Sequence, residues 1–289
     1  MSPVHAGATS RNLPRTVRPI DSQPNALPIR RSENGELHLS GAARLSAIAA
    51  SSDVRDAYPL LAIACEREDA SAADARTLAS SLAPGTNCQR TGDSVACAVN
   101  GSSRCAARDP ASPLHAILEG GPCWSAFRSL TGAALAALDA ALSDSDSGWL
   151  PADEFFARAD DLATTGTRSA GAVRRVKLPA AAAGGFQRLI VAPLEDAGGV
   201  LPMSIAAVQR ADGDVRLVLG GVAPRPYRVY TSVEEETMAG GLDEDTIAGL
   251  VDRALLDADT DPLSAGRVDA AAALLKLAIE EIAANQRSG

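Results

Sequence analysis

The sequence predicts an α+β fold, in which helices dominate the first half and a small antiparallel sheet precedes a final layer of helices. Alanine- and leucine-rich stretches fill much of the chain between residues 41 and 142. Four short runs of β-branched residues or leucine follow between residues 172 and 220, each bounded by Gly, Pro or Asp. Helical patterns resume near residue 231 and continue to the end.

Length and composition allow two domains of ordinary size. The chain has 289 residues, of which 46% are hydrophobic but only 3% aromatic. Small apolar side chains bury little area each, so we expect a core built from many modest contacts.

Charge and hydropathy exclude several classes of partner. The formal net charge of −9 argues against nucleic acid, because phosphate binding needs a basic face. No segment approaches the roughly 20 apolar residues that cross a membrane, and the N-terminus does not resemble a secretion signal. We therefore expect a cytoplasmic protein, whose five cysteines are thiols or metal ligands rather than disulfides.

The N-terminal half begins with a segment that we expect to be flexible. Residues 1–35 contain five prolines and no hydrophobic period. A strand over Glu36–Leu39 and two helical stretches follow, the second starting near Pro59 and carrying Cys65 on its apolar face. No periodic pattern survives from residue 80 to about 113. An apolar segment then starts at Ser129, and "LPADEFFARADDL" predicts a turn and a helix.

The second half changes character. "AVRRVKLP", "FQRLIVAP", "MSIAAVQR" and "DVRLVLGGVAP" predict strands, and Asp212-Gly213 between the last two predicts a hairpin. Helices are expected in "TSVEEETMAG", in "DEDTIAGLVDRALLDA" and from Ala265 to Asn285. We expect the acids of "VEEETMAGGLDEDT" to form a solvated face.

Four of the five cysteines lie in the aperiodic stretch and its continuation. Cys88, Cys97, Cys105 and Cys123 are separated by eight, seven and seventeen residues, which is not the paired spacing of ordinary zinc sites. Thiolates are soft ligands that select iron–sulfur clusters or zinc, and four of them complete one cluster. A bound cluster would also order the long loop. The alternative is four free thiols in a loop.

At "GGVAPRPYR" the chain resembles a known family. The stretch from Met203 to Ile282 is similar to the C-terminal domain of the FAD-binding (medium) subunit of molybdenum hydroxylases, which include xanthine dehydrogenase, carbon monoxide dehydrogenase and aldehyde oxidoreductases. The cysteines together with "LHAILEGGPC", Leu114 to Cys123, resemble a branch of that family with an extra 4Fe–4S cluster on the medium subunit. The resemblance covers residues 36 to 285.

The resemblance implies an organisation and a ligand set. A FAD-binding-like domain with the cysteine-rich loop would span residues 36–165, and a small antiparallel sheet packed on three helices would span residues 170–289. The 4Fe–4S cluster would be held by Cys88, Cys97, Cys105 and Cys123. His115, within the same motif, would either tune that cluster or serve as a structural histidine.

The segments that align with the family's flavin-binding loops depart from the family pattern. The second flavin loop, "GTLGGN" in the family, aligns with Arg76, Thr77, Leu78, Ala79, Ser80 and Ser81. Its paired glycines are lost, although glycine lets backbone N–H groups approach phosphate closely. The family's "PSD" reads Arg128, Ser129, Leu130, and no "AGGTDLL"-like loop precedes residue 36. We expect FAD binding to be weakened or lost, unless the hydroxyls keep a weaker site or another chain supplies the missing half.

Three functions stay open on the sequence. The chain would be an electron-transfer subunit that docks to a molybdenum-cofactor large subunit and a 2Fe–2S small subunit. Alternatively, it would be a repurposed flavin-free homologue that binds a small molecule or catalyses a cofactor-independent step. A purely structural subunit is a third reading. The catalytic residues, the substrate and the electron acceptor do not follow from the residues.

Overall fold

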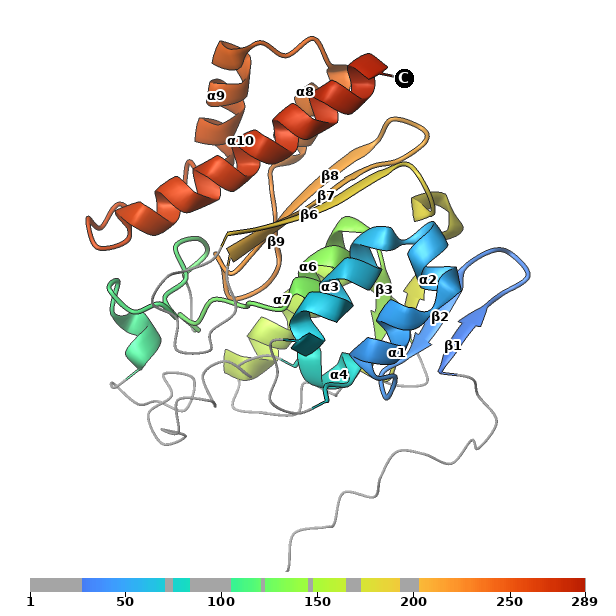
Figure 1. Cartoon of the computed structure of the whole chain (residues 1–289). Coiled ribbons are helices and arrows are strands. Elements are labelled where there is room, and N and C mark those ends of the chain that lie inside the picture. The colour runs from blue at the N-terminus through green and yellow to red at the C-terminus, as the bar shows by residue number, and fades with distance from the viewer. Residues whose placement is uncertain are drawn as a thin grey trace, which may run out of the picture.

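Two antiparallel sheets, with helices between them and outside the second, make up the fold of the computed structural model (Figure 1). The structure describes residues 28–70, 75–83, 105–120, 123–144, 148–164, 173–192 and 203–288. Cys88 and Cys97 fall outside these ranges, as does most of the predicted N-terminal flexible segment.

The first sheet has five strands in the order β1-β2-β5-β3-β4, and all of its pairs are antiparallel. The strands are β1 (Ile29–Arg31), β2 (Leu37–Ser40), β3 (Ala141–Ser143), β4 (Leu150–Pro151) and β5 (Arg175–Leu178). Alternate residues form one apolar face, on which Leu37, Leu39, Leu142, Val176 and Leu178 are buried. Because β5 pairs with β2 and β3, the chain returns to this sheet after residue 170, before it enters the second sheet.

Helices of the first half cover that apolar face. They are α1 (Leu45–Ala50), α2 (Ser52–Ala57), α3 (Pro59–Ala70), α4 (Leu78–Ser81), α6 (Leu130–Ala137) and α7 (Ala152–Thr164). Two short 3-10 turns, η2 (Ala106–Arg108) and η3 (Ala180–Ala182), belong to the connecting segments. Every residue of α6 is buried, which is typical of a helix enclosed between two layers. Cys65 on α3 is fully buried, as its place on the apolar face predicts.

The second sheet has the order β6-β7-β8-β9 and is antiparallel throughout. Its strands are β6 (Phe186–Ala192), β7 (Met203–Gln209), β8 (Val215–Gly220) and β9 (Tyr227–Arg228). The predicted hairpin joins β7 to β8, and Gly213 in its turn has φ of +90°. Both faces of β7 are buried: Ala206 and Val208 face the core with α3 and α6, while Ile205 and Ala207 face the C-terminal helices.

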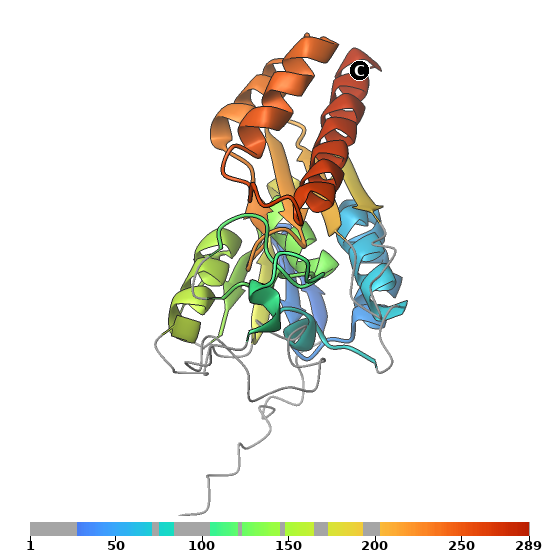
Figure 2. The same cartoon turned by 90° about the vertical axis from the view of Figure 1, so that its left-hand side faces the viewer.

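The C-terminal layer consists of α8 (Thr231–Ala239), α9 (Glu244–Ala254) and α10 (Ala265–Ser288). These helices cover one face of the second sheet, and α3 and α6 lie on its other face (Figures 1 and 2). The predicted α+β class, with an antiparallel sheet packed on three helices, is confirmed. Among the described residues no helix is long and apolar enough to cross a membrane.

Candidate functional site: the cysteine-flanked loop and the α6 N-terminus

Two of the four predicted cluster cysteines belong to the described part of the chain. Cys105 directly precedes η2, and Cys123 begins the segment that leads into α6; both are partly buried. Within the described ranges, no three or more His, Cys, Asp or Glu side chains come together in a way that could hold a metal. The four-cysteine set therefore stays a prediction, with half of it outside those ranges.

His115 lies between the two described cysteines and connects their segments. Its side chain is buried, and Nδ1 lies 2.8 Å from the carbonyl oxygen of Ala107, two residues after Cys105. Its ring stacks on Trp124, the residue after Cys123, with centroids 5.7 Å apart. The buried imidazole of His115 thus contacts a residue close in sequence to each of the two described cysteines.

The other ring nitrogen of His115 reaches the C-terminal domain. Nε2 lies 3.1 Å from Oδ2 of Asp259, in the connection between α9 and α10. The carbonyl oxygen of Ala107 and the carboxylate of Asp259 are both acceptors, so each contact calls for an N–H on the ring nitrogen that makes it. Hydrogen bonds from the Asp261 amide and the Ser264 hydroxyl lower the pKa of Asp259, and His115 adds to that effect.

Arg267, in the first turn of α10, binds backbone carbonyl groups of the loop that contains His115. The guanidinium donates to the carbonyl oxygens of Pro110, Ser112 and His115 at 2.8, 3.0 and 2.6 Å. Burial lowers the pKa of Arg267, and the charge of Asp259 opposes that shift. The fixed fork of an arginine side chain suits several carbonyls at once, which a lysine could not match.

The two segments that the sequence singles out contact each other directly. The backbone N–H groups of Ile117 and Leu118 donate to the carbonyl of Val222 at 2.8 and 3.0 Å, and Phe127 donates to Ala223 at 2.7 Å. Gly221 donates in return to Phe127 at 2.8 Å. Main-chain hydrogen bonds therefore hold Ile117, Leu118 and Phe127 against the "GGVAPRP" turn.

The segment aligned with the flavin loop folds as a capped turn of helix. Thr77 is the N-cap of α4, and Thr77 and Ser80 satisfy each other's backbone N–H groups as a capping box. The amide of Ala79 donates to the carbonyl of Gly41 at 2.8 Å. Ser81 is buried, with its hydroxyl 3.4 Å from that of Ser129. These four predicted residues thus lie together, but their hydrogen bonds are made within the chain.

Glu68 is the residue at this point that the sequence analysis missed. Its carboxylate, which is fully buried, accepts from the Thr131 amide at 2.9 Å and from the Ser129 hydroxyl at 3.0 Å, both at the N-terminus of α6. Arg76 Nη1 lies 3.3 Å from its other oxygen. A signal was present in the sequence: Leu61, Cys65 and Glu68 share one face of α3 by helical spacing, so an acid falls on a buried stripe.

The surroundings of Glu68 bear on whether FAD fits at this end of α6. Burial raises the pKa of Glu68, and the hydrogen bonds from Thr131 and Ser129 oppose that rise. A phosphate would need the donors that Glu68 already uses, and the carboxylate leaves no exposed surface beside them. The described residues of this site do not fit a pyrophosphate.

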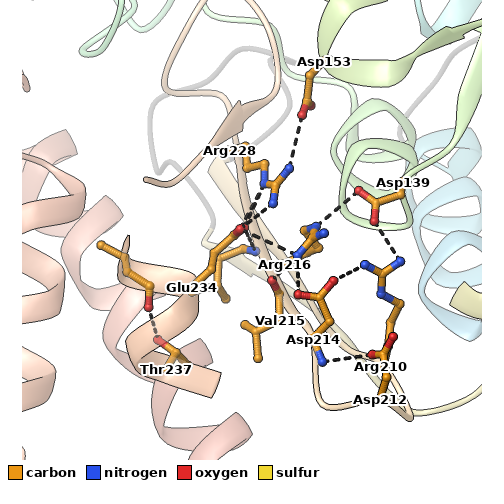
Figure 3. A network of polar contacts seen from close by, with 12 residues as sticks. Asp139, Asp153, Arg210, Asp212, Asp214, Val215, Arg216, Arg228, Glu234 and Thr237 are labelled. Carbon is orange, nitrogen blue, oxygen red and sulfur yellow. Dashed lines mark hydrogen bonds and ion pairs between the residues drawn. The ribbon is translucent and has the colours of Figure 1, made fainter. Parts of the chain in front are cut away.

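A second polar network ties the two halves of the molecule together (Figure 3). Arg216 and Arg210 on the β7–β8 hairpin both reach Asp139, after α6, at 3.3 and 3.1 Å. Arg228 of β9 pairs with Glu234 of α8 at 2.6 Å and approaches Asp153 of α7 at 3.7 Å. Charged side chains from both halves of the molecule thus form one connected network of ion pairs.

Glu234 contradicts the expectation of a solvated acidic face on α8. Its side chain is 3% exposed and also accepts from the Leu217 amide at 3.0 Å. Burial raises the pKa of Glu234, and the hydrogen bond from Arg228 opposes this shift. The prediction is wrong for this residue because α8 packs against β8 and turns Glu234 toward that strand.

Comparisons with known proteins show similarity at the level of the fold. No protein-family model matches the sequence, and no curated protein matches it either. A carbon monoxide dehydrogenase chain from Hydrogenophaga pseudoflava, lacking the Mo-pyranopterin moiety of its cofactor, has a TM-score of 0.52 at 18% identity and covers 87% of this chain and 76% of that one. Quinoline 2-oxidoreductase from Pseudomonas putida 86 has a TM-score of 0.50 at 15% identity, covering 89% and 78%. Reconstituted CO dehydrogenase from Oligotropha carboxidovorans has a TM-score of 0.50 at 14% identity, with the same coverage.

These likenesses define the class of fold. The protein has the α+β fold found in chains of carbon monoxide dehydrogenase and quinoline 2-oxidoreductase, over most of its length. At identities of 14–18% the likeness covers the fold alone.

Proposed function

We propose that the chain is an electron-transfer subunit of a molybdenum hydroxylase-type oxidoreductase that works without its own FAD. In this role it occupies the position of the FAD-binding medium subunit. Its partners would be a large subunit with the molybdenum cofactor and a small subunit with 2Fe–2S centres. The similarity to carbon monoxide dehydrogenase and quinoline 2-oxidoreductase chains supports the oxidoreductase-subunit role.

The cysteine loop would hold the electron carrier. Cys88, Cys97, Cys105 and Cys123 would ligate a 4Fe–4S cluster, which supplies one-electron transfer when bound. The observation that carries this proposal is the bracing of the loop: His115 and Arg267 tie the segments beside Cys105 and Cys123 to the α9–α10 connection and α10. Side chains that orient ligand-bearing loops are a common requirement of metal sites.

A second function is favoured by a different observation. Since Glu68 fills the α6 N-terminus, the fold could serve as a flavin-free scaffold that binds a small molecule. A pocket of about 520 Å³ lies between the end of α8 and the last turns of α10, and is lined in part by Gln209, Met238, Gly241 and Gln286. The buried Oε1 of Gln286 has no hydrogen-bond partner among the described residues, so a ligand with a donor group would suit it.

Cofactor analysis tests the first function. The full-length protein is purified without oxygen, and iron, acid-labile sulfide and extracted flavin are measured per chain. We expect about four iron and four sulfide, in keeping with one 4Fe–4S cluster, and no stoichiometric FAD. Cys105→Ser and Cys123→Ser should each lower the iron content sharply. Cys65→Ala, which removes the buried thiol of α3, is the matched control and should leave iron unchanged.

The possible outcomes separate the candidates. Iron-free wild-type protein, or equal iron in wild type and both loop variants, would overturn the iron–sulfur proposal. Colourless and metal-free protein would support the small-molecule scaffold instead. One FAD per chain after mild purification would contradict the flavin-free part of both.

A further inference from the structure

The N-terminus of α6 has the features of an anion site, although an internal group fills it. The helix begins at Leu130, and Ser129 caps it by accepting from the Gly132 amide at 2.9 Å. The Thr131 amide and the Ser129 hydroxyl both point to Oε2 of Glu68. Helix N-termini favour negative charge because their first amides lack partners within the helix.

An arginine completes the set of donors. Nη1 of Arg76 lies 3.3 Å from Oε1 of Glu68, and the two side chains are 12% and 1% exposed. Arg76, Ser129 and Thr131 thus each supply a donor to one of the two carboxyl oxygens of Glu68. A guanidinium, a hydroxyl and a helix N-terminus are also the donors that bind phosphate groups in proteins.

We infer that Glu68 is an internal anion that takes the place of a phosphate at the α6 N-terminus and thereby excludes dinucleotides from this part of the fold. Arg76 and Ser129 lie in residues 76–81 and 128–130, which align with the family's "GTLGGN" and "PSD" segments, and Thr131 follows directly. An added phosphate would lie beside a buried carboxylate, where like charges repel strongly. Glu68 is therefore a specificity-determining residue, and loss of the loop glycines is only part of the change.

This inference deepens the flavin-free part of the proposed function, and it does not depend on iron. Removing the carboxylate should turn the filled site into an open one, because Arg76 and the two donors of α6 would lose their partner. The Glu68→Ala variant should then bind inorganic phosphate. Glu68→Gln keeps the volume filled and should not bind it.

Thermal unfolding with inorganic phosphate, at ionic strength matched by sodium chloride, provides the test. For Glu68→Ala we expect a saturable rise of the unfolding midpoint, by about 5 °C at a hundredfold excess over Kd. Adding Arg76→Met to this variant should reduce the rise by more than half. Wild type, Glu68→Gln and Glu66→Ala, which alters an exposed acid on the same helix, should show no saturable rise.

Several results would overturn the inference. Saturable phosphate or ADP binding by wild type would do so, as would a folded Glu68→Ala variant that does not respond to phosphate. If Glu68→Ala does not fold, its refolding yield is compared in phosphate and in chloride. A yield at least severalfold higher in phosphate supports the site, and equal yields refute it. Iron and sulfide content, measured on the same preparations, reports on the cysteine loop separately, so failure of the iron–sulfur proposal is distinguishable.

Discussion

His115 and Asp259 lie 144 residues apart in the sequence, yet Nε2 of the imidazole is 3.1 Å from Oδ2 of the carboxylate. The pair connects the loop between the two described cysteines to the α9–α10 connection. Because Nδ1 of His115 also contacts the Ala107 carbonyl, one buried ring joins three segments of the chain. In the proposed cluster site, these contacts would orient the loop that carries Cys105 and Cys123.

A double-mutant cycle should detect this contact. We expect His115→Asn and Asp259→Asn each to destabilise the protein, with a coupling energy of about 1 kcal/mol or more, because the histidine is buried. The measurement is urea unfolding of the two single variants and the double variant. The His38–Glu36 pair, at 3.5 Å and about one quarter exposed on both sides, is the matched control. Its coupling should stay below about 0.5 kcal/mol, and additive effects at His115 and Asp259 would contradict the prediction.

Glu68 should make folding depend on pH in a defined direction. Burial raises its pKa above the ordinary value of 4.5, so between that value and the folded-state pKa the native protein holds a proton that the unfolded chain has lost. The native state then binds more protons, and the free energy of unfolding falls as pH rises through this window. In Glu68→Gln this contribution is absent, so the wild-type stability relative to the variant should decline as pH increases from about 4.5.

Urea unfolding of wild type and Glu68→Gln at a series of pH values checks this slope. Leu61→Ala, a buried change on the same helix without a titratable group, controls for reduced stability alone. It should lower the whole curve and leave its pH dependence as in wild type. The prediction would be contradicted if the free energy of unfolding of wild type, relative to that of Glu68→Gln, increased with pH. That result would show that folding lowers the Glu68 pKa.

Local patterns predicted the second half of the fold well. The Asp212-Gly213 turn and the short strand runs determine neighbouring pairings, so β7 and β8 follow from the sequence directly. The pairing of β5 with β2 does not, because Val176 meets Leu39 across 137 residues and the strand itself looks like those after it. Pairing partners at that separation depend on the whole topology.

Sequence separation also decides which parts of the candidate site the sequence could point to. Cys105, His115 and Cys123 stand within one recognisable stretch of sequence, and the turn on which it rests carries its own motif. Glu68 meets Ser129 and Thr131 from 61 and 63 residues away, and neither of those residues is unusual at a helix start. Helical spacing could flag an acid on the buried face of α3, but not the donors that satisfy it.

The Glu234–Arg228 pair should be costly to break. The Glu234 side chain is only 3% exposed, and its carboxylate is an acceptor for Arg228 and for the Leu217 amide. Because Glu234→Ala removes this buried acceptor, we expect the free energy of unfolding to fall by about 3 kcal/mol or more. Arg253 and Glu236, an ion pair whose side chains are 47% and 41% exposed, provide the comparison. Glu236→Ala should cost about 0.5 kcal/mol or less. Urea unfolding measures both, and equal losses would show that burial of Glu234 does not matter.

Gly41 should tolerate no side chain, because backbone encloses it. A Cβ added there would lie 1.9 Å from the carbonyl oxygen of Val173, and the Gly41 amide already donates to Arg174 at 2.6 Å. Since the carbonyl of Gly41 also accepts from Ala79, a shift of this backbone would disturb α4 as well. We expect Gly41→Ala to destabilise the protein by about 3 kcal/mol or more.

Gly249, in the middle of α9, gives the opposite expectation for the same substitution. A Cβ there meets nothing within 4 Å, and alanine loses less conformational freedom than glycine when a helix forms. Gly249→Ala should therefore raise the free energy of unfolding by about 0.5–1 kcal/mol. Both variants are compared with wild type by urea unfolding. A Gly41→Ala variant as stable as wild type would contradict the prediction. It would show that the backbone around Gly41 is not packed closely enough to exclude a methyl group.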